Sequence, residues 1–237
     1  MCLRIAVLTA TTFGLMAQAP DESNLAYQRF TALARDSAAP LADVLKAADE
    51  FLRAYERTSP GPQTIPPYVD VARFYATKGV RTADILPLLE KGVAEISNPG
   101  SWTQARAHSG RSPFLDDIER ALAANVYTQV GRYDKARELL AAAEPTFSRT
   151  NASDLDLATA RIFSALQFQY RESLALLAIG EGLKEEALEL ERAILTQRNP
   201  VISPRLLQEN RARAQRLWSE LGRPGGDFDS RLANGSR

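Results

Sequence analysis

The stretch DIERALAANVYTQVGRYDKARELLAAAEPTFSRT, residues 117–150, decides the fold. Its first half places residues on one helix face at spacings of three: Ala121, Ala124 and Tyr127. Gly131 then ends this helix, because glycine adopts the left-handed conformation just past a helix end at little cost. The second half has its own apolar stripe at spacings of three and four: Tyr133, Ala136, Leu140 and Ala143. The stretch therefore predicts two helices joined by a tight turn.

Alanines stand where these two helices would face each other. Side chains this small let two backbones approach closely and pack without cavities. We therefore expect Ala124, Ala136 and Ala143 to lie at a close helix crossing. We expect the second helix to end at Pro145 and the residues that follow it, 146–150.

This pattern resembles the tetratricopeptide repeat, a helix–turn–helix unit of 34 residues. The positions that match the repeat are Ala124, Tyr127, Gly131, Tyr133, Ala136 and Ala143, with Leu140 in place of the usual Phe. Three positions depart from it: Arg120 replaces Trp, Ala123 replaces Leu and Ser148 replaces Pro. The resemblance implies stacked helical hairpins whose surface engages peptides or partner proteins. The alternative is an ordinary αα-hairpin of a helical bundle.

The rest of the chain also has helical patterns, and no segment shows the sustained Val/Ile/Thr alternation of a strand. Further helices are expected over residues 22–35, 40–55, 68–77, 83–96, 153–179, 184–197 and 204–221. The turn glycines Gly79, Gly131 and Gly182 are 52 and 51 residues apart, which exceeds the 34 of a strict array. The predicted fold is all-α, an irregular antiparallel helical-hairpin solenoid that is tetratricopeptide-repeat-like.

The N-terminus has the three-part form of a secretory signal peptide. Arg4 precedes an uncharged, mostly apolar run, residues 5–16, and Ala17 and Ala19 offer cleavage sites. The run is too short to span a bilayer comfortably, although an uncleaved anchor or a buried N-terminal helix is an alternative. We therefore expect a signal peptide at 1–19, a helical domain at 20–221 and a disordered tail at 222–237, in a periplasmic or secreted protein.

The composition excludes several kinds of chemistry. Cys2 is the only cysteine and would be removed with the signal peptide, and His108 is the only histidine. No phosphate loop, zinc spacing, calcium loop or nucleophile elbow occurs, so we expect no cofactor, no metal and no catalytic residue. Lys plus Arg equals Asp plus Glu at 29 each, so the charge gives no strong attraction to nucleic acid.

The clustered charged residues have simple structural interpretations. Acids near the start of the first central helix, Asp116, Asp117 and Glu119, complement the helix dipole. The acids over 185–191 are expected to form a solvated face: Glu185, Glu186, Glu189 and Glu191. The arginines of the last helix are expected to solvate it: Arg205, Arg211, Arg213 and Arg216. A carboxylate-only hydrolase stays open as an alternative and would require an acidic cleft.

One irregular segment, residues 102–111, is the candidate site of partner contact. Long internal connections are often functional, and Trp and Arg are enriched at binding hot spots. The candidate contact residues are Trp102, Arg106, His108 and Arg111. The alternative is that Trp102 only pins the loop between neighbouring hairpins.

Two functions follow from these observations. The first is an exported, non-catalytic helical-repeat protein that mediates protein–protein or peptide interaction as a scaffold or adaptor. The second is a helical accessory domain of a redoxin-type thiol–disulfide system whose catalytic domain lies elsewhere. The exported start, the irregular hairpins and residues 213–232 are similar to the helical regions that precede redoxin domains in some exported bacterial proteins. The sequence contains no redoxin motif and leaves the oligomeric state open.

Overall fold

A computed structural model describes residues 22–36, 38–57, 67–97, 115–196 and 202–230. Throughout these ranges the regular structure is helical, without strands. The α-helices are α1 (Glu22–Arg35), α2 (Leu41–Arg57), α3 (Tyr68–Thr77), α4 (Thr82–Ser97), α6 (Leu115–Gln129), α7 (Tyr133–Arg149), α8 (Leu157–Gly180), α9 (Lys184–Thr196) and α10 (Pro204–Glu220). Two 3₁₀ turns, η1 (Ala152–Asp154) and η2 (Gly225–Asp227), complete the described elements. The predicted all-α class is confirmed.

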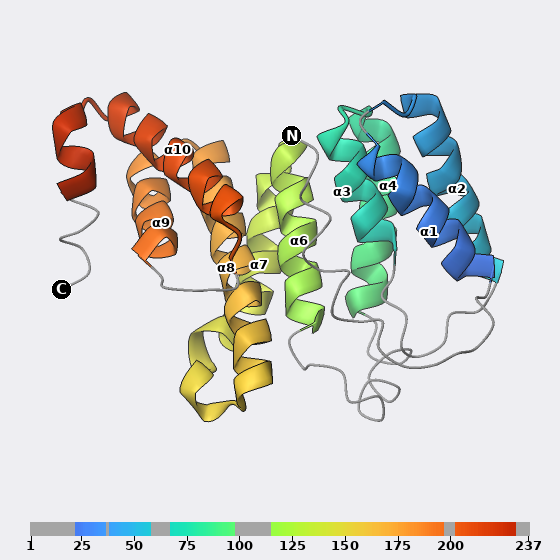
Figure 1. Cartoon of the computed structure of the whole chain (residues 1–237), viewed down its shortest axis with the longest axis horizontal. Helices are drawn as coiled ribbons and strands as arrows, with labels where there is room; N and C mark the ends of the chain where they lie inside the picture. The colour runs from blue at the N-terminus through green and yellow to red at the C-terminus, as the bar shows by residue number, and fades with distance from the viewer. Residues whose placement is uncertain (1–21, 37, 58–66, 98–114, 197–201, 231–237) are drawn as a thin grey trace.

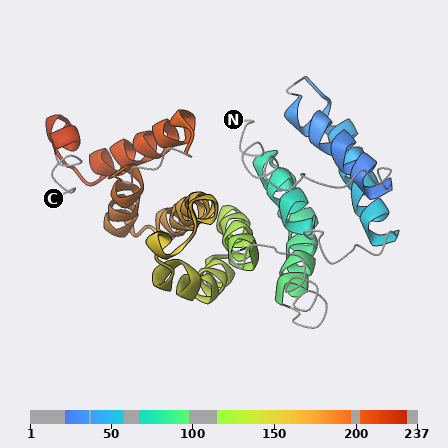
Figure 2. The same ribbon diagram turned by 60° about the horizontal axis from the view of Figure 1, so that its bottom comes forward.

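The helices follow one another in space in the order of the sequence (Figure 1). α3 and α4 pack on α6, α6 packs on α7 and α8, α8 packs on α9, and α9 packs on α10. The row is curved, with the α1–α2 hairpin at one end and α10 at the other (Figure 2). Contact between sequence neighbours along a row is the arrangement of a helical solenoid, as predicted.

Four of the described helices end in the same way, at the glycines Gly79, Gly131, Gly182 and Gly222. Gly131 has a φ of 76°, a left-handed conformation in which any other side chain would be strained. The next residue, Arg132, donates its backbone N–H to the carbonyl oxygen of Tyr127 at 2.8 Å, the bond of a Schellman motif. The three glycines expected at turns from the sequence therefore lie at turns.

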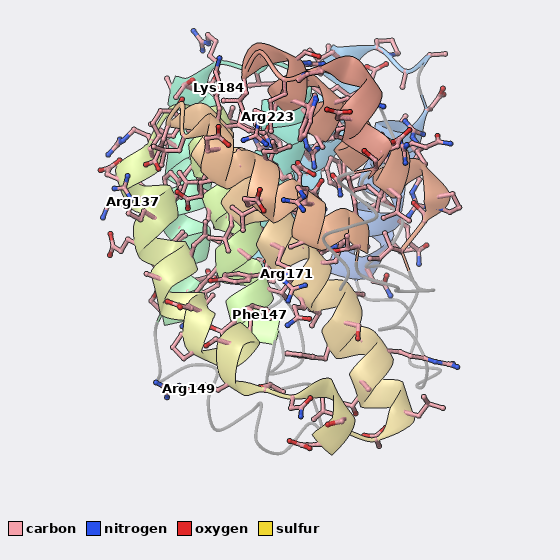
Figure 3. All side chains as sticks on the ribbon, turned by 90° about the vertical axis from the view of Figure 1, so that its left-hand side faces the viewer. Arg137, Phe147, Arg149, Arg171, Lys184 and Arg223 are labelled. Carbon is pink, nitrogen blue, oxygen red and sulfur yellow. The ribbon has the colours of Figure 1, made fainter. Side chains whose placement is uncertain are left out.

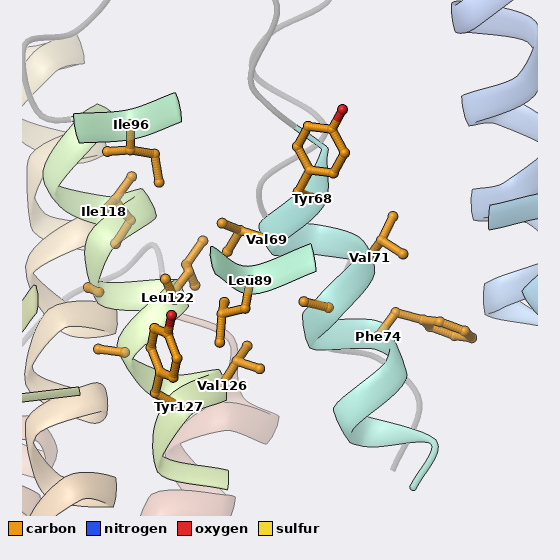
Figure 4. Close-up of a cluster of buried hydrophobic side chains, with 14 of the residues drawn as sticks. Tyr68, Val69, Val71, Phe74, Leu89, Ile96, Ile118, Leu122, Val126 and Tyr127 are labelled. Carbon is orange, nitrogen blue, oxygen red and sulfur yellow. The ribbon is translucent and has the colours of Figure 1, made fainter. Parts of the chain in front are cut away.

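Helix α6 is the centre of the core, buried on nearly every side. Leu122 and Val126 point toward Val69 of α3 and Leu89 of α4, and Ile118 lies beside Ile96 of α4 (Figure 4). An apolar helix buried all round needs neighbours on all sides, which the flanking hairpins supply. The core of the row is therefore built around α6.

The α1–α2 hairpin is joined to α3 through aromatic rings. The ring of Phe74 points away from α6 (Figure 4) and contacts the ring of Phe30 edge to face, with centroids 5.4 Å apart. Tyr55 of α2 meets Tyr68 of α3 in the same geometry at 5.7 Å. Large rings bridge a wider spacing between helices than the alanines of the central hairpin do.

The second central helix, α7, runs through Pro145 and ends at Arg149, within the stretch predicted to end it. Proline removes one backbone hydrogen bond, but its fixed φ is compatible with a helix. The continued turn places Phe147 in the core, where it stacks on Tyr170 at 4.6 Å and on Phe163 at 5.9 Å between ring centroids. This apolar packing offsets the missing bond.

Helix α8 begins later than residue 153, where the sequence pattern placed its start. Residues 152–154 form η1, and Asp156 is the N-cap. The Asp156 carboxylate accepts the backbone N–H groups of Ala158 and Thr159 at 3.0 and 3.1 Å. Hydrogen bonds of this kind define a helix start.

Ordered structure extends past the boundary predicted at Leu221. Residues 222–230 include η2, and Phe228 is buried against Trp218. The remaining tail, 231–237, and the predicted signal peptide, 1–19, lie outside the described residues. Among the described helices, none is long and apolar enough to cross a membrane.

Candidate functional site

The four residues expected to contact a partner, Trp102, Arg106, His108 and Arg111, all lie outside the described residues. Their role stays a prediction. The functional chemistry of the described part must therefore be sought in its own polar clusters and surfaces.

The residues that carry the repeat resemblance form the inside of the hairpin. Ala124, Ala136 and Ala143 are completely buried, and Tyr127 and Leu140 nearly so. A side chain on Gly180 of α8 would approach the Tyr133 ring to 2.6 Å, so α8 also lies very close to this hairpin. These positions set the spacing of helices and present little surface to a ligand.

A buried ionic cluster joins α8, α9 and α10. Arg213 of α10 donates from Nε to Glu191 Oε1 at 2.6 Å and from Nη2 to Glu172 Oε1 at 3.0 Å. It also contacts the Asn210 side chain through Nη2. Glu191 and Asn210 are fully buried, and Glu172 is 8% exposed. We call these four residues the Arg213 cluster.

This cluster corrects two expectations from the sequence. Glu191 was expected on a solvated face and Arg213 on a solvating one, yet Glu191 is fully buried and the Arg213 side chain is only 16% exposed. The inward side of α9 faces two other helices, so a charge there is removed from water and must be paired. One sequence signal could have indicated the inward position of Glu191. It lies at helical spacing from Ala187, Leu188 and Ile194, and so on the apolar side of α9.

Burial alone would lower the pKa of Arg213, but the two neighbouring carboxylates raise it above its ordinary value. The guanidinium therefore stays charged. Breaking such a buried pair is strongly destabilising, because the remaining charge has no compensation. The cluster accordingly fixes how α10 sits on α8 and α9.

A second polar cluster lies where α2 meets α3 and α4. Lys91 Nζ lies 2.6 Å from Glu56 Oε1 and 4.5 Å from the centre of the Tyr68 ring. The Tyr68 hydroxyl donates to the same Glu56 oxygen at 3.1 Å. The hydrogen bond from Lys91 holds the pKa of Glu56 below its ordinary value. These contacts tie the α1–α2 hairpin to the next one.

Glu95, also on α4, behaves in the opposite way. Burial raises its pKa, although Lys91 and the hydrogen bond from Tyr55 act to lower it. Opposite shifts in two neighbouring carboxyl groups are the pattern by which an acid and a base are assigned in some active sites. Here Glu56 is already paired with Lys91, so these contacts attach the α1–α2 hairpin to α4. Because its pKa is raised, Glu95 takes up a proton at a higher pH than an exposed glutamate does.

Exposed ion pairs connect the outer helices at the C-terminal end of the row. Arg137 pairs with Glu181, Lys184 with Glu220 at 3.1 Å, and Arg223 with Glu185. Lys184 and Arg223 lie near one another at the same end of the molecule, whereas Arg149 lies at the opposite end (Figure 3). Pairs in which both side chains are exposed, such as Lys184 with Glu220, contribute little to stability.

No group of three or more His, Cys, Asp or Glu side chains in the described ranges is placed to hold a metal ion. Comparison with known proteins gives no relative: no family model, no curated protein and no solved structure matches this chain. The function must therefore be argued from the geometry of the chain itself.

Proposed function

We propose that the chain is an exported, non-catalytic helical-repeat protein, tetratricopeptide-repeat-like in kind, that binds a protein or peptide partner as a scaffold or adaptor. The observation that carries this proposal is the serial packing of helices along a curved row (Figure 2). A row of this kind leaves an extended surface, which proteins of this architecture use to bind peptides and partners.

The polar clusters also favour binding over catalysis. The carboxylates of Glu172 and Glu191 are buried against one guanidinium, and that of Glu56 is paired with Lys91. A carboxylate hydrolase needs two carboxyl groups that face a substrate across a gap. Carboxylates paired in this way hold helices together instead.

The proposal is tested with the mature chain, immobilised and exposed to the exported fraction of its host. We expect it to retain a specific protein, whose affinity is then measured with the purified components. Failure to retain any protein above the level of an unrelated helical control contradicts the proposal. Protein isolated from the host should begin after Ala17 or Ala19, and an intact N-terminus on a cytoplasmic form would contradict export.

Trp102→Ala separates the two interpretations of the candidate contact segment. If Trp102 contacts the partner, the substitution weakens binding and leaves the melting temperature unchanged. If Trp102 pins the loop, the same substitution costs about 3–5 kcal/mol, as truncation of a core aromatic residue does. A destabilised protein that still binds its partner contradicts the contact role.

A further inference from the structure

The last helix of the row carries a small surface that the protein covers with its own chain. Leu217 and Trp218 of α10 share an apolar cluster with Ala178 and Leu188 of the preceding helices, and Phe228 closes this cluster from outside. Two arginines, Arg211 and Arg223, flank it. We call the surface formed by Arg211, Leu217, Trp218 and Arg223 the Trp218 face.

Two side chains of the following segment, Phe228 and Asp229, contact this face. The Phe228 ring meets the Trp218 ring edge to face, with centroids 5.9 Å apart and an interplanar angle of 74°. The Arg211 guanidinium lies 5.8 Å from the centre of the Phe228 ring and forms an ion pair with Asp229. An aromatic ring followed directly by a carboxylate is therefore the chemistry that the Trp218 face accepts.

Some contacts that hold the face come from outside that segment. Arg223 lies over the Trp218 ring at 4.9 Å and pairs with Glu185 of α9, so Trp218 is held by groups outside residues 224–230 as well. The end of α10 is closed by the backbone of Leu221, Gly222 and Arg223. Release of the segment leaves the closing bonds of α10 in place.

The segment is attached in a way that makes release easy. Pro224, Gly225 and Gly226 connect it to α10, and Trp218 Nε1 donates one hydrogen bond to the Pro224 carbonyl at 2.8 Å. The ion pair between Arg211 and Asp229 is largely exposed, and such pairs contribute little. Glycines gain much conformational freedom on release. The segment is held mainly by a single ring.

We propose that the Trp218 face is a peptide-binding site, occupied in the free protein by Phe228 and Asp229. Its ligand is a partner segment that carries an aromatic residue followed directly by Asp or Glu, and binding displaces the protein's own segment. The proposal rests on the proposed function, for which it names a surface and a peptide class. Trp and Arg, which form this face, are the residue types most enriched at binding hot spots. The tethered segment competes at a high effective concentration, so weak ligands are excluded.

The test uses a fluorescent peptide, PGGDFDS, with the sequence of residues 224–230, and the full chain. Its anisotropy is measured with wild type and with Phe228→Ala, which vacates the face. We expect the variant to bind the peptide at least about tenfold more tightly than wild type, since intramolecular competition is removed. The same peptide with alanine in place of its phenylalanine should not bind.

Matched arginine substitutions locate the site. In the Phe228→Ala protein, Arg211→Ala removes both the cation near the ring and the ion pair, so it should weaken peptide binding, whereas Arg205→Ala should leave it unchanged. Arg205 lies on the same helix with similar exposure and pairs with Glu209. Equal affinity of wild type and Phe228→Ala, or equal loss with both arginine substitutions, overturns the proposal.

A second variant keeps the test decisive if Phe228→Ala loses helix content by circular dichroism. Phe228→Leu keeps an apolar side chain but removes the aromatic contacts with Trp218 and Arg211, so it should bind the peptide more tightly than wild type by a smaller factor. No gain in affinity overturns the proposal. Because the peptide comes from this chain, the test needs no partner. Failure to find a partner would contradict the proposed function without touching this result.

Discussion

Helix α8 forms two interfaces of opposite character. Toward α6 and α7 it packs on alanines and aromatic rings, with Ser173 donating to the Ala121 carbonyl at 3.0 Å and Tyr170 to the Leu140 carbonyl at 3.3 Å. Toward α9 and α10 it contributes Glu172 to the Arg213 cluster. The first interface depends on close, mostly apolar packing. The second also has apolar contacts, among them Ala178 with Leu188 and Phe168 with Ile194, but it encloses charges that must be paired. The two should therefore respond differently to substitution.

The largest effect is expected at the charged interface. Arg213→Ala leaves Glu172 and Glu191 buried without their guanidinium, which should lower the free energy of unfolding by about 3–5 kcal/mol. Urea unfolding followed by circular dichroism measures this change. The control is Arg205→Ala, which breaks an exposed pair on the same helix and should cost less than about 1 kcal/mol. Similar losses in the two variants would mean that the cluster contributes no more than a surface pair.

The same comparison explains what the sequence could and could not predict. The α6–α7 hairpin depends on neighbouring residues, so its apolar spacing and its turn glycine, Gly131, were sufficient to find it. The Arg213 cluster depends on three helices whose approach no local pattern encodes. The spacing of Glu191 from Ala187, Leu188 and Ile194 indicates an inward position, but no local pattern indicates that its partner is an arginine of another helix.

The sequence did not predict where two ordered segments end, for a related reason. Pro145 was among the residues expected to end a helix, but the helix continues past it, and Phe147, two residues later, stacks on Tyr170 and Phe163. Phe228 was placed in a disordered tail, but it finds Trp218 across a glycine-containing turn. Tertiary packing of one ring outweighs a local preference in each case.

The apolar interface should respond to volume rather than to charge. Ala136 is completely buried, so Ala136→Leu inserts a large side chain where none fits and should cost about 1–3 kcal/mol. Ala142→Leu, on the exposed side of the same helix, is the control and should change the melting temperature little. An Ala136→Leu protein as stable as the control would contradict close packing of this hairpin.

The smallest effect is expected at Glu95, a half-buried carboxyl group between α2 and α4. Its surroundings are intermediate between the apolar interface of α8 and the Arg213 cluster. Burial raises the pKa of Glu95 above its ordinary value of 4.5. The folded state therefore binds this proton more tightly than the unfolded chain, and stability rises as the pH falls from the folded-state pKa toward 4.5. Glu95→Gln is neutral at every pH and lacks this gain. The variant should consequently compare best with wild type near neutral pH, and its advantage should decrease as the solution is acidified.

We expect a change below about 1 kcal/mol, because solvent screens a partly exposed group. Unfolding free energies of both proteins across this range give the difference, with Glu90→Gln on the exposed side of α4 as the control for loss of one acidic group. A difference that does not vary with pH would mean that Glu95 is as well solvated in the folded protein as in the unfolded chain. Burial of charge would then affect stability at the Arg213 cluster and not at Glu95.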